Sequence, residues 1–143
     1  MIGRGAVMGD FVRDPSDWLR RFSPAEWIRA ALGELRRAEA AYERGDARAG
    51  VVGVKRAAGM ALNAALLVEP NVVWGRSYLE HLEGLARDQD VPEAVRAASR
   101  AVLEVKPPSP GVVSLRTPRT QERALDAASD VIAHAWAVVK RHE

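Results

Sequence analysis

Apolar positions recur every three or four residues through most of the chain, which is the period of an amphipathic α-helix. Strand signals are nearly missing, because there is no alternating β-branched run and no Asn-Gly or Asp-Gly turn. The pattern therefore predicts an all-α protein, an up-and-down bundle of four to five helices with short connections. The predicted helices cover residues 24–44, 47–69, 72–87, 92–105 and 118–141.

Signals for helix ends define the first helical pair. Ser23, Pro24 and Glu26 form a capping box with proline in the first turn, so they predict where the first helix begins. Gly45 predicts its end, and Asp46 can cap the helix that follows. The first two helices are therefore expected to be joined by a short turn.

The later breaks are set by proline and by polar caps. Pro70 stops the second helix, and Asp90 is the predicted cap of the fourth. The string "KPPSPG" is the strongest breaker in the chain, and after it Thr117 and Pro118 open the last helix.

The residues before Ser23 are less regular. The string "DPSDWLRRF" predicts a short helix, capped by Asp14 or Ser16, that places Trp18 and Phe22 on the bundle. The chain thus divides into an N-terminal segment with this short helix, residues 1–22, and the helical bundle, residues 23–143.

The apolar stripe of each helix predicts the side chains of the core. The stripes include Leu32 in the first helix, Leu79 in the third and Trp136 in the last. The stripe of the second helix is mostly alanine and valine, and small side chains let helix axes approach closely. Gly59 and Asn63 stand in that helix although neither favours a helix interior. A glycine there would let a neighbouring helix pack closely.

Composition narrows the class of protein. A chain of 143 residues with 48% apolar and 28% charged residues is long enough for one domain with its own core. Cysteine is absent, which excludes disulfides and sulfur-ligated metal sites. No apolar stretch reaches the roughly 20 residues of a membrane span, and the first residues lack the apolar region of a signal peptide. We therefore expect a cytoplasmic protein without a membrane partner.

Net charge gives only a weak indication of the ligand. A charge of +2 is too small to argue for nucleic acid by itself. Of the 21 basic residues 18 are arginine, a side chain that pairs well with phosphate. The simpler explanation of this bias is the codon usage of a GC-rich genome.

Two helical families come close to this pattern. "AYERGDARA" followed by "EPN" is similar to a tetratricopeptide repeat, but about two dozen residues separate Gly45 from Pro70. That is too many for the second helix of such a repeat, and no second copy follows. A second family matches better, and the match depends on three stretches. They are the alanine-rich helical pair that begins "WIRAALGELRRAEAAYERGDARAG", the stretch "WGRSYLEHLEGLARDQDVPEA" and the stretch "LRTPRTQERALDAA". In that order they resemble the HEPN family, the nucleotide-binding helical bundles of higher eukaryotes and prokaryotes, over residues 26–141.

The resemblance implies a bundle whose polar site has been reduced in this chain. The family's second helix usually carries a glutamate and a lysine one turn apart, and this chain has Gly59 and Asn63 at those places. Further departures are Glu34, Arg76 and Thr117, in place of the family's aspartate, histidine and tyrosine.

The resemblance therefore favours a non-catalytic interaction module that binds a nucleotide, RNA or a partner nucleotidyltransferase. The alternative is a ribonuclease toxin of a toxin–antitoxin pair. The ribonuclease branch of the family uses an arginine followed a few residues later by a histidine, as in "RSYLEH" from Arg76 to His81. Histidine can move protons near neutral pH and arginine can hold a phosphate. Because the string lies earlier in the chain than the family's motif, we assign no catalytic residue and keep Arg76 and His81 as the alternative. A structural bundle unrelated to the family is the third possibility.

A ligand anion is expected near the start of the last helix. Arg116 and Arg119 flank Thr117 and Pro118, where unpaired backbone N–H groups favour negative charge. Arg116 and Pro118 are also what remains of the loop that the family writes as Arg-Tyr-Pro.

Aromatic residues at the ends of helices predict self-association. Trp18, Phe22 and Trp74 lie at or near segment ends, and Tyr78 follows Trp74 by one turn. Aromatic side chains are enriched at the centre of interfaces, and two-fold pairing is the commonest assembly. We therefore predict a homodimer whose interface includes Trp18, Trp74 and Tyr78.

Metal and cofactor sites find no support in the sequence. The three histidines, His81, His134 and His142, lack the spacing of a metal site. The glycine-rich string "GRGAVMG" is not followed by the Lys-Ser/Thr pair of a P-loop. We therefore expect no metal and no cofactor.

Overall fold

The computed structural model describes residues 11–108 and 117–143 of the chain. Five α-helices and one short 3-10 helix make up these two ranges, which contain no strand, so the predicted all-α class is confirmed. The elements are α2 (Pro24–Glu43), α3 (Ala47–Val68), η1 (Val72–Trp74), α4 (Tyr78–Arg87), α5 (Glu93–Glu104) and α6 (Thr117–Lys140).

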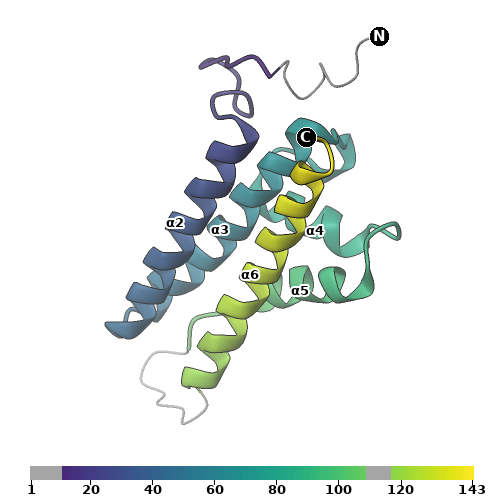
Figure 1. Ribbon diagram of the computed structural model, residues 1–143. Coiled ribbons are helices and arrows are strands. Elements are labelled where there is room, and N and C mark those ends of the chain that lie inside the picture. The colour runs from purple at the N-terminus through teal and green to yellow at the C-terminus, as the bar shows by residue number, and fades with distance from the viewer. Residues whose placement is uncertain (1–10, 109–116) are drawn as a thin grey trace.

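The three long helices form the body of the bundle (Figure 1). α2 and α6 run in opposite directions along the front of the molecule, and α3 lies behind them. α3 packs against both, while α4 and α5 form a short pair that contacts α3 and α6. The order is that of an up-and-down bundle with a small side pair.

α3 is the central helix. Most of its residues are buried, among them Val54, Leu62 and a series of alanines. Its small side chains bring α2 close, since a Cβ atom placed on Gly53 would lie 2.9 Å from the Cβ atom of Ala38. The predicted close approach of helices along this stripe is therefore present.

The apolar character of α3 has a second aspect. By length and composition alone it could cross a membrane, so the expectation that no stretch is long enough was wrong. In the fold, however, 67% of its most apolar window is buried inside the protein itself. A buried central helix passes the same test as a membrane span, because both are apolar all round.

The caps of the first helical pair are as predicted. The Ser23 side chain accepts from the backbone N–H of Glu26, and the Glu26 carboxylate accepts from the backbone N–H of Ser23. The Asp46 side chain accepts from the backbone N–H of Ala49 at 3.0 Å and so begins α3. Gly45 follows α2 with a φ of 85°, a left-handed conformation that suits glycine.

The third helix starts later than predicted. Instead of one helix over 72–87, η1 is followed by Gly75 with a φ of 65°, and α4 begins only after Ser77. Ser77 and Glu80 form a second capping box, which was not among the predicted helix ends. The positive φ of Gly75 takes the backbone out of the helical conformation between η1 and α4, so the two do not form one continuous helix.

The predicted cap of the fourth helix was also wrong. Pro92, and not Asp90, precedes α5, and no side chain caps its first turn. Asp90 donates its backbone N–H to the side chain of Asp88 in the preceding turn. Proline with its fixed φ suits the start of a helix without any side-chain bond.

Three predicted core residues lie at the surface. Leu32, Leu79 and Trp136 are 39%, 49% and 39% exposed, whereas Trp27, which the stripes did not include, is fully buried. Periodicity shows which side of a helix is apolar, but it does not show how far neighbouring helices extend around that side.

The N-terminal segment packs on the bundle but is not helical between residues 11 and 22. The predicted short helix is a series of turns, because the Asp14 side chain accepts from the backbone N–H and hydroxyl of Ser16. Such local side-chain bonds compete with helix formation. The segment is held to α2 by the Arg13–Glu26 ion pair at 2.7 Å and by the Trp27 indole N–H, which donates to the Leu19 carbonyl at 2.8 Å.

Candidate functional site

The contact between α3 and α4 explains the glycine in the middle of α3. A methyl group at Gly59 would overlap the Cβ atom and the ring of Tyr78, so this position has room only for hydrogen. Gly84 likewise leaves room for Trp74, because a Cβ atom at residue 84 would overlap the Trp74 ring. Close packing against an aromatic ring thus offsets the helix-propensity cost of about 1 kcal/mol at Gly59.

Asn63 is explained by a buried histidine from α4. The imidazole of His81 is fully buried, with Nδ1 2.8 Å from the Trp74 carbonyl oxygen and Nε2 2.8 Å from the Asn63 amide oxygen. A carbonyl oxygen can only accept, so in a neutral ring Nδ1 carries the proton and Nε2 is left as an acceptor. The Asn63 amide then faces Nε2 with its N–H group, since its oxygen and nitrogen exchange places by a half turn.

Burial keeps this imidazole neutral. Loss of water around the ring lowers the pKa of His81 below its ordinary value of 6.5, and the bond to Trp74 and the charge of Glu80 oppose that shift only in part. His81 is therefore a neutral core side chain with a hydrogen bond at each ring nitrogen.

The N-terminal segment covers the histidine with a tryptophan. The ring centroids of Trp18 and His81 are 5.8 Å apart in a stacked arrangement, and Tyr78 approaches His81 edge-on at 6.4 Å. We call Asn63, His81, Trp18 and Tyr78 the histidine centre. Aromatic pairs at such distances add stability beyond the area that they bury.

Arg76 and His81 do not form an open pair. The Arg76 guanidinium lies 5.3 Å from the centroid of Trp18, on a residue that itself stacks on His81. Arg76 is exposed and precedes the first helical residue of α4, whereas His81 faces α3. A general base must reach the proton that it takes, and both ring nitrogens of His81 are already engaged.

The aromatic residues predicted for an interface are used largely within the chain. Trp74 is 7% exposed and packs on α4, and Tyr78 is half-buried against Gly59. Trp18 and Phe22 are half-buried, and the Phe22 ring meets Trp27 edge-on at 4.9 Å. Little of the Trp74 ring remains for a partner.

The predicted anion site is only partly described. Arg116 lies outside the described residues, and the side chains of Thr117 and Pro118 do as well. Arg119 is exposed in the first turn of α6. The proposal of a ligand anion between Arg116 and Arg119 stays a prediction.

The other two histidines have separate surroundings. His134 is half-buried in α6, and burial lowers its pKa. His142 lies beside the Glu69 carboxylate at 2.6 Å, as does Arg141 at 2.9 Å. Among the described residues no three histidine, aspartate or glutamate side chains gather as metal ligands.

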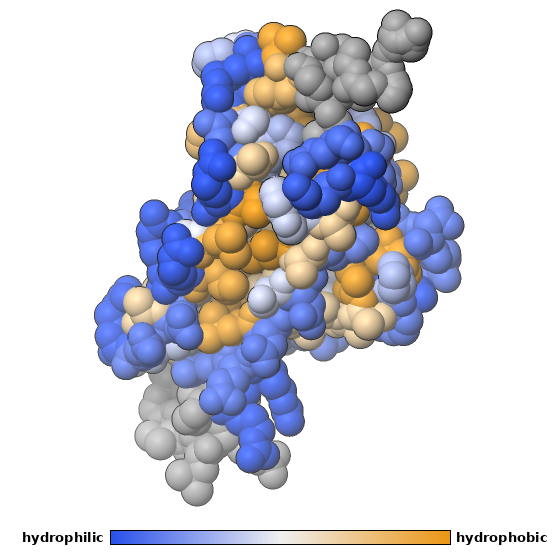
Figure 2. All heavy atoms as spheres, viewed as in Figure 1, coloured by the Kyte–Doolittle hydropathy of each residue, from blue (hydrophilic) through white to orange (hydrophobic). Residues whose placement is uncertain are grey.

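An apolar groove runs between α2 and α6. Figure 2 shows apolar surface gathered between these helices on the front of the molecule. The groove is open, with a volume of about 380 Å³, and Leu32 and Trp136 stand exposed on its two sides. It is lined by Ala25, Ile28, Arg29, Leu32, Ser129, Ile132, Ala133 and Trp136.

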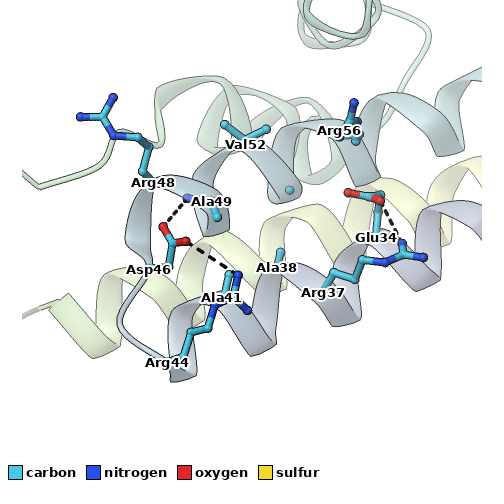
Figure 3. Close-up of a pocket in the computed structure, with 11 residues that line it drawn as sticks. Glu34, Arg37, Ala38, Ala41, Arg44, Asp46, Arg48, Ala49, Val52 and Arg56 are labelled. Atoms are coloured by element: carbon cyan, nitrogen blue, oxygen red, sulfur yellow. Dashed lines mark hydrogen bonds and ion pairs between the residues drawn. The ribbon is translucent and has the colours of Figure 1, made fainter.

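A second open cavity, of about 440 Å³, lies between α2 and α3 on the side away from α6 (Figure 3). Its floor consists of small side chains, and we call it the arginine pocket after the four guanidinium groups around it. These belong to Arg37 of α2, to Arg44 directly after α2, and to Arg48 and Arg56 of α3.

Comparisons with protein-family profiles, with curated proteins and with solved structures found no match to this chain. The assignment of a function therefore depends on the geometry of these surfaces.

Sequence reasoning missed both open surfaces. Leu32 and Trp136 looked like core residues, and only the positions of the neighbouring helices show that they border a groove. Arg48 and Arg56 carry a readable signal, because they are eight residues apart on α3 with Val52 midway between them. Residues spaced by four lie on one helix face.

Proposed function

We propose that this protein is a non-catalytic interaction module, HEPN-like in its sequence pattern, that pairs with a second copy of itself. The observation that carries this proposal is the apolar groove between α2 and α6, with Leu32 and Trp136 exposed on its two sides. Exposed apolar surface of this kind, with charged residues around it, is typical of an interaction site.

Charge around the groove favours a second copy as the occupant. Arg29 and Arg36 are exposed on α2, and Asp126 and Asp130 are exposed on α6. None of the four belongs to an ion pair within the two described ranges. One copy thus offers both a basic and an acidic edge, which is what a self-complementary surface requires.

The direction of the helices selects one two-fold arrangement. α2 and α6 are antiparallel, so a two-fold axis parallel to them places α2 of each copy over α6 of the other (Figure 1). Leu32 and Ser129 both line the groove. Because α2 and α6 are antiparallel, Arg36, one turn after Leu32, and Asp126, about one turn before Ser129, lie toward the same end of it. Opposite charges then meet across the interface. An axis perpendicular to the helices would instead place α2 on α2 and like charges together.

The histidine centre supports the non-catalytic part of the proposal. His81, the one candidate base of the ribonuclease alternative, is buried under Trp18 with both ring nitrogens hydrogen-bonded. The groove is thus open to a partner, whereas the histidine is not.

Sedimentation tests the proposal. The parent protein is expected to sediment as a species of twice 15.6 kDa, and Leu32→Glu is expected to sediment as a monomer of 15.6 kDa. Leu79→Glu is the matched control, because Leu79 is also an exposed leucine, at 49% against 39% for Leu32, and lies on α4 outside the groove. A parent protein that stays monomeric at high concentration, or a Leu32→Glu variant that still pairs, would overturn the proposal.

A charge exchange tests the direction of the axis. Arg29→Asp with Arg36→Asp should weaken pairing, and so should Asp126→Arg with Asp130→Arg, while the variant with all four changes should pair again. If the variant with all four substitutions does not pair again, the axis parallel to the helices is wrong.

Incubation with RNA separates the module from the ribonuclease. We expect no cleavage by the parent protein. Cleavage that disappears in both Arg76→Ala and His81→Ala would instead support the toxin.

A further inference from the structure

The arginine pocket has a floor of small residues from α2 and α3, and one larger apolar side chain rises beside it (Figure 3). Ala38, Ala41, Ala49 and Gly53 form a shallow floor, and Val52 rises from α3 with 55% of its surface exposed. A floor of small residues lets another helix approach the helix pair closely.

The four guanidinium groups are not equally engaged. Arg37 pairs with Glu34 at 2.9 Å, and Arg44 pairs with Asp46 at 3.7 Å. Arg48 and Arg56 have no ion pair or hydrogen bond to any described residue, and both are exposed. Surface ion pairs contribute little, so Arg37 and Arg44 can also turn to a new partner.

The two unengaged arginines have a defined spacing. They lie eight residues apart on one face of α3, which corresponds to about 12 Å along the helix axis. Val52 stands midway between them (Figure 3). A complementary surface therefore carries two negative groups about 12 Å apart with an apolar group between them.

Carboxylates on a helix fit this pattern better than the phosphates of a nucleic acid. The pocket has no aromatic side chain on which a base could stack. The N-terminus of α3, where a phosphate would otherwise bind, is already capped by Asp46, whose carboxylate accepts the N–H of Ala49. An α-helix with glutamates one turn before and one turn after a leucine reproduces the spacing and also covers Val52.

We infer that the arginine pocket binds an acidic amphipathic helix of a partner protein. The glutamates of that helix pair with Arg48 and Arg56, and its apolar stripe lies over Val52 and the alanine floor. This surface lies on the opposite side of α2 from the groove, so a homodimer formed through the groove leaves it accessible.

A designed peptide tests the inference. The probe is an alanine-rich helix of about 20 residues, long enough to be partly helical in water, with leucines on one stripe and four glutamates beside them. Its control is the same peptide with glutamine at those four positions, which keeps the shape and removes the charge. Fluorescence anisotropy at low ionic strength measures the affinity of each peptide for the full chain.

The glutamate peptide is expected to bind at least about tenfold more tightly than the glutamine peptide, and its affinity should fall as salt is added. Arg48→Gln with Arg56→Gln should weaken binding about tenfold, since two exposed ion pairs are lost. The matched control is Arg87→Gln with Arg123→Gln, which removes two exposed guanidinium groups outside the pocket and should leave the affinity unchanged.

Three results would overturn the inference. They are equal affinity for the two peptides, unchanged affinity of the Arg48→Gln, Arg56→Gln variant, or tighter binding of a single-stranded RNA oligonucleotide that depends on the same two arginines. The last result would make the pocket a nucleic-acid surface. Failure of this inference is distinguishable from failure of the proposed pairing. Sedimentation of the same variants reports pairing through the groove, whereas peptide affinity reports binding at the arginine pocket.

Discussion

The histidine centre and the α2–α6 groove each contain a tryptophan, Trp18 in the centre and Trp136 in the groove, and they differ in what lies over the side chains. In the centre, Trp18 stacks on His81, Tyr78 fills the space left by Gly59, and both ring nitrogens are bonded. In the groove, Leu32 and Trp136 lie on neighbouring helices and each stays 39% exposed, although the Lys140 ammonium lies 5.2 Å from the centroid of the Trp136 ring. Whether an aromatic or apolar residue is structural or available to a partner is therefore decided by the segment that lies over it. Substitutions in the histidine centre should therefore change the free energy of unfolding more than substitutions in the groove.

The largest effect is expected where the centre is tightest. Gly59→Ala should lower the free energy of unfolding by about 3 kcal/mol, because the added methyl group overlaps the Cβ atom and ring of Tyr78. Urea unfolding followed by circular dichroism measures the change.

Gly33→Ala is the matched control. A Cβ atom at Gly33 would meet only the ends of two arginine side chains, the nearer at 3.7 Å, so this variant should gain up to about 1 kcal/mol of helix propensity. A loss of equal size in both variants would mean that the close contact with Tyr78 does not exist.

The hydrogen bond between Asn63 and His81 should have the next largest effect. Asn63→Ala leaves Nε2 of a buried imidazole without a partner, at a cost of about 2 kcal/mol. In a double-mutant cycle with His81→Ala, the two costs should fail to add by about 1 kcal/mol, since the second change removes the unpaired group. Strict additivity would show that the two side chains do not interact.

Acid should weaken the centre through His81. Its pKa in the folded protein is lowered by burial, so the unfolded chain takes up a proton near pH 6.5 that the folded protein resists. Stability is thus complete above about pH 6.5 and falls below it, by at most about 1.4 kcal/mol per pH unit for this group.

His134 acts in the same direction, because burial lowers its pKa too. The measurement therefore compares the urea midpoint at pH 7.5 with the urea midpoint at pH 5.5. The lower pH stays above the ordinary pKa of carboxylates, which is about 4. His81→Leu should reduce the fall by the part that His81 contributes. An unchanged fall in that variant would assign the whole effect to His134.

The smallest effect on folding is expected in the groove. Leu32→Glu should change the free energy of unfolding of the monomer by less than about 0.5 kcal/mol, because Leu32 is already exposed. Chemical unfolding must be measured at concentrations where the parent and the variant are both monomers, since pairing adds to apparent stability. A loss of more than about 1 kcal/mol would place Leu32 in the core and remove the contrast between the two regions.

The sequence predicted the long helices well because their signals are local. The capping box of Ser23 and Glu26, the cap of Asp46 and the break at Pro70 all act within a few residues. The start of α4 was placed too early because the interruption at Gly75 depends on a positive φ, which glycine can adopt but the sequence does not announce.

The site was much less predictable, because it depends on contacts between distant parts of the chain. Asn63 and His81 are 18 residues apart, and Trp18 reaches His81 from a segment that local bonds keep in turns. The spacing of Arg76 and His81 suggested a catalytic pair, but it carried no information on Trp18, which contacts both side chains. Exposure of Leu32 and Trp136 likewise follows from the width of the bundle and not from periodicity.

The bond from the Trp27 indole N–H to the Leu19 carbonyl gives the N-terminal segment a spectroscopic marker. The chain has four indole N–H groups, and this one belongs to a fully buried ring whose hydrogen-bond acceptor lies on the segment itself. Its proton can exchange with deuterium only when residues 11–22 lift from α2 or the whole domain unfolds. The rate at which one resonance fades in heavy water therefore reports how often Trp18 leaves His81.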